Sequence, residues 1–206
     1  MLNIDMQTIQ IIEEAINNLA DEFRCVPGML LNEDDLKYHL MVKLNDINNF
    51  RCPSPSADEN VLATSIHAEV PWFDENNELR LRPDITITDP KSLSIIRPMQ
   101  KGITFPKKGV HFVGNSVILE LKFYKGRKGV SQSSLTAIKT DIDKIKRLVE
   151  RNREVNPGAF LYGIVVVFSR YEHRRPEIEE LVSQTNGCVR LIVRSANFSH
   201  QFISDT

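Results

Sequence analysis

The sequence places an acidic and a basic residue two positions apart inside an apolar segment. Glu120 and Lys122 stand in the run Ser-Val-Ile-Leu-Glu-Leu-Lys-Phe, residues 116–123. Alternate residues of a strand point to the same side, so the two charges share one face. A strand this apolar is mostly buried, and ionised groups buried without partners are costly. Either the two residues form a simple ion pair at a frayed strand end, or a divalent cation binds the carboxylate while the lysine faces water or a phosphate.

Three carboxylates earlier in the sequence add to this pair. Asp84 follows Pro83 on the polar face of a predicted strand, Glu69 lies on the non-core face of that strand's hairpin partner, and Glu33 opens a predicted helix. Each acid also has an ordinary structural explanation, such as ending a strand, facing solvent or favouring a helix N-terminus. Taken together, oxygen ligands without cysteine suit a hard cation such as Mg²⁺ or Mn²⁺ rather than zinc.

The spacing of apolar residues predicts the elements that position these groups. In chain order they are a helix over 6–23, a helix from residue 33, strands over 61–72, 79–88 and 116–123, a helix around 135–149, a strand over 160–168, a short helix near residue 176 and a strand over 189–194. Asn32 is the expected N-cap of the second helix. Pro83 marks an edge, bulge or bend, residues 89–113 form an irregular insertion, and the order predicts one α/β domain.

This arrangement resembles the PD-(D/E)xK nuclease superfamily, which has a restriction-endonuclease-like fold with an α-β-β-β-α-β core. The resemblance rests on Pro83-Asp84 and Glu120-Leu121-Lys122, followed by an amphipathic helix and an apolar strand. It implies a central mixed sheet flanked by helices, in a single nuclease-like domain over 1–206. Its core spans about 33–168, with 1–28 as an additional N-terminal helix and 169–206 as a C-terminal helix and strand.

The resemblance also implies roles for individual residues. Asp84, Glu120 and the backbone carbonyl of Leu121 would ligate Mg²⁺ or Mn²⁺, and the additional acids Glu69 and Glu33 would act directly or through water. Lys122 would orient or help to deprotonate the attacking water and stabilise charge on the phosphate. Asp141 and Lys144, on the following helix, are further candidates to reach the site.

The implied activity is metal-dependent hydrolysis of phosphodiester bonds in DNA, with RNA as an alternative substrate. The enzyme would be an endonuclease in restriction, phage defence or mobile-element processing. One alternative is a non-catalytic DNA-binding or assembly module of the same fold. The other is an α/β interaction domain in which Glu120 and Lys122 form a structural ion pair.

The net charge of −1 conceals a segregation of charge along the chain. Residues 1–50 carry 3 basic and 9 acidic side chains, whereas residues 101–155 carry 13 basic and 5 acidic side chains, a formal charge of +8. A polyanion responds to the local potential, so the basic stretch is compatible with nucleic-acid binding, although a solvated helix face explains it equally. The candidate phosphate contacts are Lys101, Lys107, Lys108, Lys125, Arg127 and Lys128.

Composition limits the remaining classes of protein. With 206 residues, of which 41% are hydrophobic, the chain can bury a substantial core. Three cysteines far apart in the sequence indicate neither a disulfide framework nor a zinc site. The longest apolar run, 161–168, is too short to span a bilayer. We therefore expect a reduced, cytoplasmic protein without a membrane partner. One small domain without an evident sequence-reading module favours either modest specificity or specificity that a homodimer partner or another subunit confers.

Overall fold

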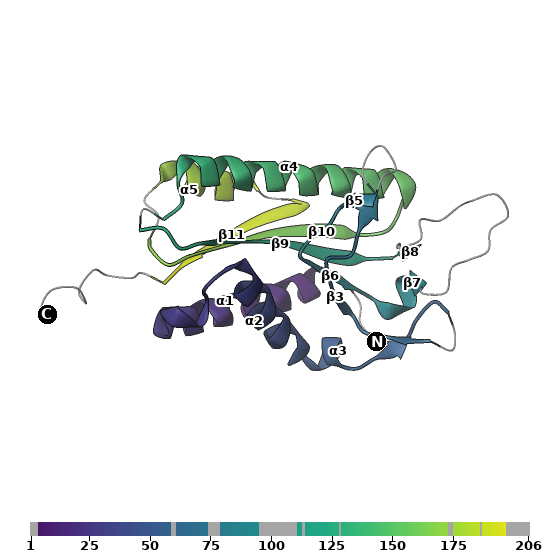
Figure 1. Ribbon diagram of the computed structural model, residues 1–206. Helices are drawn as coiled ribbons and strands as arrows, with labels where there is room; N and C mark the ends of the chain where they lie inside the picture. Colours follow the sequence, from purple (N-terminus) through teal and green to yellow (C-terminus); the bar gives the residue numbers. More distant parts are fainter. Residues whose placement is uncertain are drawn as a thin grey trace, which may run out of the picture.

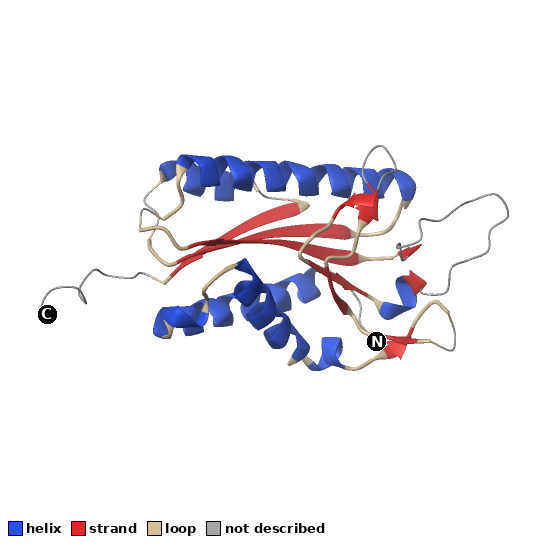
Figure 2. Cartoon of the chain, in the orientation of Figure 1, coloured by secondary structure: helices blue, strands red, loops and turns tan. Residues whose placement is uncertain are grey.

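A five-stranded mixed sheet lies between two layers of helices (Figure 1). The computed structural model describes residues 4–58, 61–73, 79–94, 111–112, 114–127, 129–172, 175–185 and 187–196. Helices α4 (Gln132–Val155) and α5 (Pro176–Gln184) cover one face of the sheet, and α1 (Met6–Cys25) and α2 (Glu33–Asn45) cover the other (Figure 2). The predicted mixed α/β class with helices flanking a mixed sheet is confirmed.

The strand order in the sheet is β11-β10-β9-β6-β3. These strands are β3 (Ile66–Ala68), β6 (Ile85–Thr88), β9 (Ser116–Tyr124), β10 (Leu161–Ser169) and β11 (Val189–Ser195). Neighbours among β3, β6 and β9 are antiparallel, whereas neighbours among β9, β10 and β11 are parallel. Parallel neighbours need a crossover connection, and α4 and α5 provide the two that this sheet requires. Strand β10 is buried along its whole length, as its apolar sequence predicts.

The prediction of one continuous strand over 61–72 is wrong. The segment divides into β2 (Leu62–Ala63), β3 and β4 (Trp72–Phe73). The break after β3 has a local cause, because Glu69 has a φ of +51°, in the left-handed region that a continuous strand does not contain. Leu62 is 66% exposed because β2 pairs with β1 (Ser54–Pro55) and not with the central sheet.

The strand predicted over 79–88 is also interrupted. It divides into β5 (Leu79–Leu81), which pairs with β4, and β6, which pairs with β3. Pro83 lies in the interruption, where a bend was expected. The predicted hairpin partners are therefore correct, although two short pairs replace one long pair.

Several short elements were not evident from the apolar pattern. They are the 3₁₀ turns η1 (Pro27–Met29) and η2 (Pro90–Ser92), helix α3 (Asn48–Arg51), and the pair of β7 (Leu93–Ser94) with β8 (His111–Phe112). The last pair belongs to the predicted insertion over 89–113, of which residues 95–110 and 113 lie outside the described part of the chain.

Capping residues fix where the two helices next to the site begin. The Asn32 side-chain oxygen accepts a hydrogen bond from the backbone N–H of Asp35 at 2.8 Å, which confirms the predicted cap of α2. The Ser131 hydroxyl accepts one from the backbone N–H of Ser134 at 3.2 Å at the start of α4. Over the described ranges, the helices lack the combination of length and apolar character needed to cross a membrane.

Helix α4 approaches the sheet closely at one glycine. A Cβ added to Gly163 of β10 would lie 2.1 Å from Cγ2 of Ile145 on α4. In the sheet, Gly163 is paired with Ile118 of β9, whose side chain packs in the core on the α4 side. The missing side chain therefore lets α4 lie against the face of β9 on which Glu120 and Lys122 follow Ile118.

Candidate functional site

Strand β9 extends beyond the end of its pairing with β6. That pairing stops at Ile85 and Leu119, whereas pairing with β10 continues to Tyr124. The end of β9 therefore has a backbone edge that β6 does not cover, and the Leu121 N–H donates there to Oδ2 of Asp84 at 2.8 Å. The N–H and C=O of one strand residue leave the strand on the same side, so the Leu121 carbonyl faces this edge too. Asp84 and the Glu120-Leu-Lys122 segment thus come together.

Glu120 is buried at the interface between β9 and α4. It is 7% exposed, and Nζ of Lys144 on α4 lies 3.2 and 3.1 Å from its Oε1 and Oε2. Burial raises the pKa of the Glu120 carboxyl, Lys144 opposes that shift, and the negative charge of Asp84 adds to it. The pKa of Glu120 is raised overall, and Lys144 is the strongest influence that lowers it.

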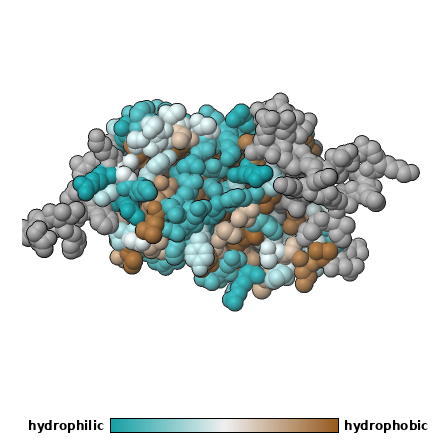
Figure 3. Space-filling model, in the orientation of Figure 1, coloured by the Kyte–Doolittle hydropathy of each residue, from teal (hydrophilic) through white to brown (hydrophobic). Residues whose placement is uncertain are grey.

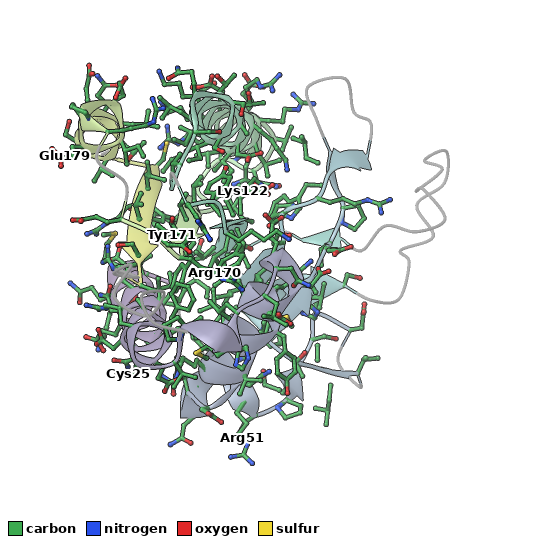
Figure 4. All side chains as sticks on the ribbon, turned by 60° about the vertical axis from the view of Figure 1, so that its left-hand side comes forward. Cys25, Arg51, Lys122, Arg170, Tyr171 and Glu179 are labelled. Carbon is green, nitrogen blue, oxygen red and sulfur yellow. The ribbon has the colours of Figure 1, made fainter. Side chains whose placement is uncertain are left out.

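Lys122 is held among carboxylates from three different elements. Its Nζ lies 3.4 Å from Oδ2 of Asp141 on α4, 3.6 Å from Oε1 of Glu120, and 3.7 Å from Oε1 of Glu33 on α2. Burial lowers the pKa of Lys122, but these carboxylates outweigh burial and leave the pKa above its ordinary value. The predicted Glu120–Lys122 pair is present, and it is part of a larger network below α4 (Figure 4).

Glu33 reaches the site from the first turn of α2. Burial raises the pKa of its carboxyl, Lys122 lowers it, and the charge of Asp84 raises it again. A hydrogen bond with the backbone of Phe123, on β9, also lowers this pKa. Helix α2 therefore brings the Glu33 carboxylate to the end of β9, close to Lys122.

Lys37, one helical turn after Glu33, joins the two remaining candidate acids. Its Nζ lies 2.7 Å from Oε1 of Glu69 and 3.4 Å from Oδ1 of Asp84. The backbone N–H of Glu69 also donates to the backbone oxygen of Asp84 at 3.1 Å. The Glu69 side chain is 60% exposed and lies at the rim, so its link to Asp84 runs through Lys37 and the backbone.

Acidic groups outnumber basic groups in this network. Among the described residues, six carboxylates and three ammonium groups take part in its ion pairs, and the positive charge of Arg82 also acts on Glu69. These groups together leave a formal excess of two negative charges. The acids are Glu33, Asp34, Glu69, Asp84, Glu120 and Asp141, and the bases are Lys37, Lys122 and Lys144. A site with this excess favours an additional cation.

The donor chemistry of the site suits a hard divalent cation. Among the described residues, no group of three or more His, Cys, Asp or Glu side chains is arranged to hold a metal ion. Asp84 and Glu120 offer two carboxylates, and the Leu121 carbonyl adds a backbone oxygen on the same edge. Mg²⁺ is commonly bound by one or two carboxylates with water completing its coordination, so this oxygen-only set fits such an ion. In the structure, Lys37 pairs with Asp84 and Lys144 pairs with Glu120, so each of these carboxylates has a lysine as its counter-ion.

The predicted phosphate contacts are only partly described. Lys125 and Arg127 are exposed directly after β9, next to the network. Lys101, Lys107, Lys108 and Lys128 lie outside the described residues. On the face shown in Figure 3, hydrophilic residues gather over the centre and hydrophobic residues form separate patches.

The sequence pattern did not indicate two basic residues near the site, Lys37 and Arg170. Lys37 looks like an ordinary charged position of α2, although its spacing from Glu33 puts the two residues on neighbouring turns. Arg170 follows β10, donates from Nη2 to the Leu30 carbonyl at 3.0 Å, and lies with its guanidinium carbon 5.8 Å from the centre of the Phe123 ring. Figure 4 shows Arg170 between Lys122 and the layer formed by α1 and α2.

No family model matches the sequence, and neither a curated protein nor a solved structure matches the chain.

Proposed function

We propose that this protein is a metal-dependent nuclease that hydrolyses phosphodiester bonds in DNA. The observation that carries the proposal is the meeting of Asp84, Glu120 and Lys122 at the uncovered end of β9, reinforced by the 2.8 Å hydrogen bond from the Leu121 N–H to Asp84. Asp84 and the Glu120-Leu-Lys122 segment lie far apart in the sequence, and the fold brings them together. The excess of carboxylates around them favours a divalent cation, and the exposed Lys125 and Arg127 directly follow β9.

The order of elements supports the same proposal. If the short elements between them are left aside, α2, β3, β6, β9, α4 and β10 occur along the chain in the order helix, three strands, helix and strand. This is the order expected for a restriction-endonuclease-like core, and β9, which carries Glu120 and Lys122, is the third strand of that series. Asp84 directly precedes β6, the second strand.

Asp84, Glu120 and the Leu121 carbonyl would hold Mg²⁺ or Mn²⁺. The bound ion would lower the pKa of a coordinated water and offset negative charge on the phosphate. Asp141 and Glu33 hold the ammonium group of Lys122 beside Glu120, where its positive charge can orient a water and stabilise the anionic phosphate.

The decisive experiment is a cleavage assay with linear duplex, circular duplex and single-stranded DNA and with RNA, in Mg²⁺, Mn²⁺ or EDTA. Wild type is compared with Glu120→Gln, Lys122→Met and the control Lys146→Met, since Lys146 is exposed on α4. We expect EDTA to abolish cleavage, and the first two variants to lose at least about 10²-fold in rate, as is typical when a charge-stabilising or acid–base group is removed. The control should retain full activity.

Each alternative gives a different result in this assay. Cleavage of circular DNA identifies an endonuclease, and cleavage of RNA alone changes the substrate class. Equal cleavage by wild type and Lys122→Met means that a contaminant cuts or that the site is misplaced. Nucleic-acid binding without cleavage under any condition supports the non-catalytic module of the same fold.

A further inference from the structure

Each of the two carboxylates expected to bind the metal has its own lysine. Nζ of Lys144 lies within hydrogen-bond distance of both carboxylate oxygens of Glu120, at 3.2 and 3.1 Å. Nζ of Lys37 lies 3.4 Å from Oδ1 of Asp84, whose other oxygen accepts from the Leu121 N–H. The two lysines come from helices on opposite faces of the sheet (Figure 1).

These lysines lie in the site and not at its rim. The side chains of Lys37 and Lys144 are 14% and 21% exposed. The ammonium group of Lys144 contacts both oxygens of Glu120, and it therefore occupies the position of a metal ion bound through both oxygens. The lysine and the ion therefore compete for one carboxylate.

Lys144 differs from Lys37 and Lys122 in its partners. Lys37 also contacts Oε1 of Glu69 at 2.7 Å and Oδ1 of Asp34 at 3.8 Å, so it keeps two carboxylates if the Asp84 contact is lost. Asp141 and Glu33 hold the ammonium group of Lys122 at 3.4 and 3.7 Å, in addition to Glu120 at 3.6 Å. Loss of the Glu120 contact would still leave Lys122 two carboxylates. Lys144 has ion pairs within the described residues to Glu120 alone, so a competing cation would free it.

We propose that Lys37 and Lys144 are built-in counter-ions of Asp84 and Glu120, and that a divalent cation replaces both of them at these carboxylates. Lys144 is then released, whereas Lys37 stays with Glu69. The inference rests on the proposed function and concerns the regulation of that same site. The buried Glu120 is paired with a cation before and after the exchange, and metal affinity depends on the strength of the lysine contacts. The released ammonium group of Lys144 becomes available to an anionic substrate.

The first test is Mn²⁺ affinity, measured calorimetrically for wild type, Lys37→Met, Lys144→Met, Glu120→Gln and the control Lys146→Met. Removal of a competing ammonium group should tighten Mn²⁺ binding about tenfold in each of the first two variants, which corresponds to about 1.4 kcal/mol. Glu120→Gln should weaken binding at least about tenfold, and Lys146→Met should leave it within about twofold of wild type.

The second test follows the lysines in the wild-type protein, so it does not depend on a variant that folds. The protein is acetylated briefly with and without Mn²⁺, and the modification of each lysine is measured by mass spectrometry. We expect acetylation of Lys144 to rise several-fold with Mn²⁺, that of Lys37 to change less because it stays paired with Glu69, and that of Lys146 to stay constant. If the lysines weaken Mn²⁺ binding only through their positive charge and do not move, their removal changes Mn²⁺ affinity, but Mn²⁺ does not change their acetylation in the wild-type protein.

The two tests separate the counter-ion exchange from the proposed function. If wild type shows no Mn²⁺ binding that depends on Glu120, the proposed metal-dependent function fails, and the exchange fails with it. If Glu120-dependent binding is present but acetylation of Lys144 does not respond to Mn²⁺, the exchange is wrong and the proposed function stands. Tighter binding in the lysine variants without increased acetylation of Lys144 also overturns its release.

Discussion

The contact between Lys144 and Glu120 predicts a measurable coupling in stability, independently of any activity. Lys144→Met keeps most of the aliphatic volume and removes the charge, and Glu120→Gln keeps the shape of the carboxyl group. Because Glu120 is 7% exposed, Lys144→Met leaves a buried carboxylate with Lys122, at 3.6 Å, as its nearest remaining base. Lys144→Met should therefore lower the free energy of unfolding more in the wild-type protein than in the Glu120→Gln variant.

The magnitude follows from the geometry. Two unit charges separated by 3.1 Å attract each other by about 5 kcal/mol at an effective dielectric constant of about 20. The lost hydration of both groups offsets most of this attraction, and Lys122 replaces part of it in the variant. We therefore expect Lys144→Met to lower the free energy of unfolding by about 1–3 kcal/mol, which for a chain of this size lowers the Tm by about 2–12 °C.

The assay is a double-mutant cycle in the presence of a chelator. Urea and thermal unfolding are measured for wild type, Lys144→Met, Glu120→Gln and the double variant, with Lys146→Met as the control for loss of a lysine on α4. Once Glu120 is neutral, loss of Lys144 should cost little, so the coupling energy should be about 1–3 kcal/mol. If the two single effects on the free energy of unfolding sum to the effect of the double variant within about 0.5 kcal/mol, the contact is refuted. The geometry of the network is then refuted with it.

Three further predictions concern the elements that support the site. Gly163→Ala should cost about 1–3 kcal/mol in urea unfolding, because its Cβ would lie 2.1 Å from Ile145 Cγ2 and would push α4 outward; unchanged stability would contradict the close approach of α4. Asn32→Ala should cost about 1 kcal/mol through loss of the α2 cap, and Asn32→Asp should retain it; equal losses in the two variants would argue against the cap. Burial raises the pKa of the Tyr162 hydroxyl above its ordinary value of 10.0, so the unfolded chain ionises first and stability should fall as the pH rises above 10.0. Tyr162→Phe should flatten this alkaline loss in thermal unfolding measured across that range, and an identical alkaline slope in both proteins would disprove the assignment.

The features predicted correctly are those that a local pattern determines. The apolar run that became β10 could only be a strand covered on both faces, and Asn32 followed by three acids fixed the start of α2. The alternation along β9 also put Glu120 and Lys122 on one face before any partner was known. In each case, residues close together in the sequence determine the local structure.

Most features that the sequence pattern did not predict depend on distant parts of the chain, and the break after β3 is the local exception. Lys37 meets Glu69 and Asp84 across 32 and 47 positions, so nothing in the periodicity of α2 distinguishes it from a solvated lysine. The break after β3 depends on the left-handed backbone of Glu69, a conformation that favours glycine and that no turn motif announces. The pairing of Leu121 with Asp84 needs the register of β6 on β9, which only the assembled sheet determines.

The charged end of β9 is not required to build the sheet, and this is the strongest physical reason to regard it as a functional site. In β10, the residues paired with Glu120 and Lys122 are Val165 and Val167, which are fully buried in the core on the α4 side. Apolar side chains thus fill the equivalent positions one strand away. Replacing a buried ion pair by apolar residues is often neutral or stabilising by about 1–4 kcal/mol, so stability alone does not favour the charges. A structural ion pair would explain a balanced network, whereas a cation site also explains the excess of negative charge among the described residues of this one.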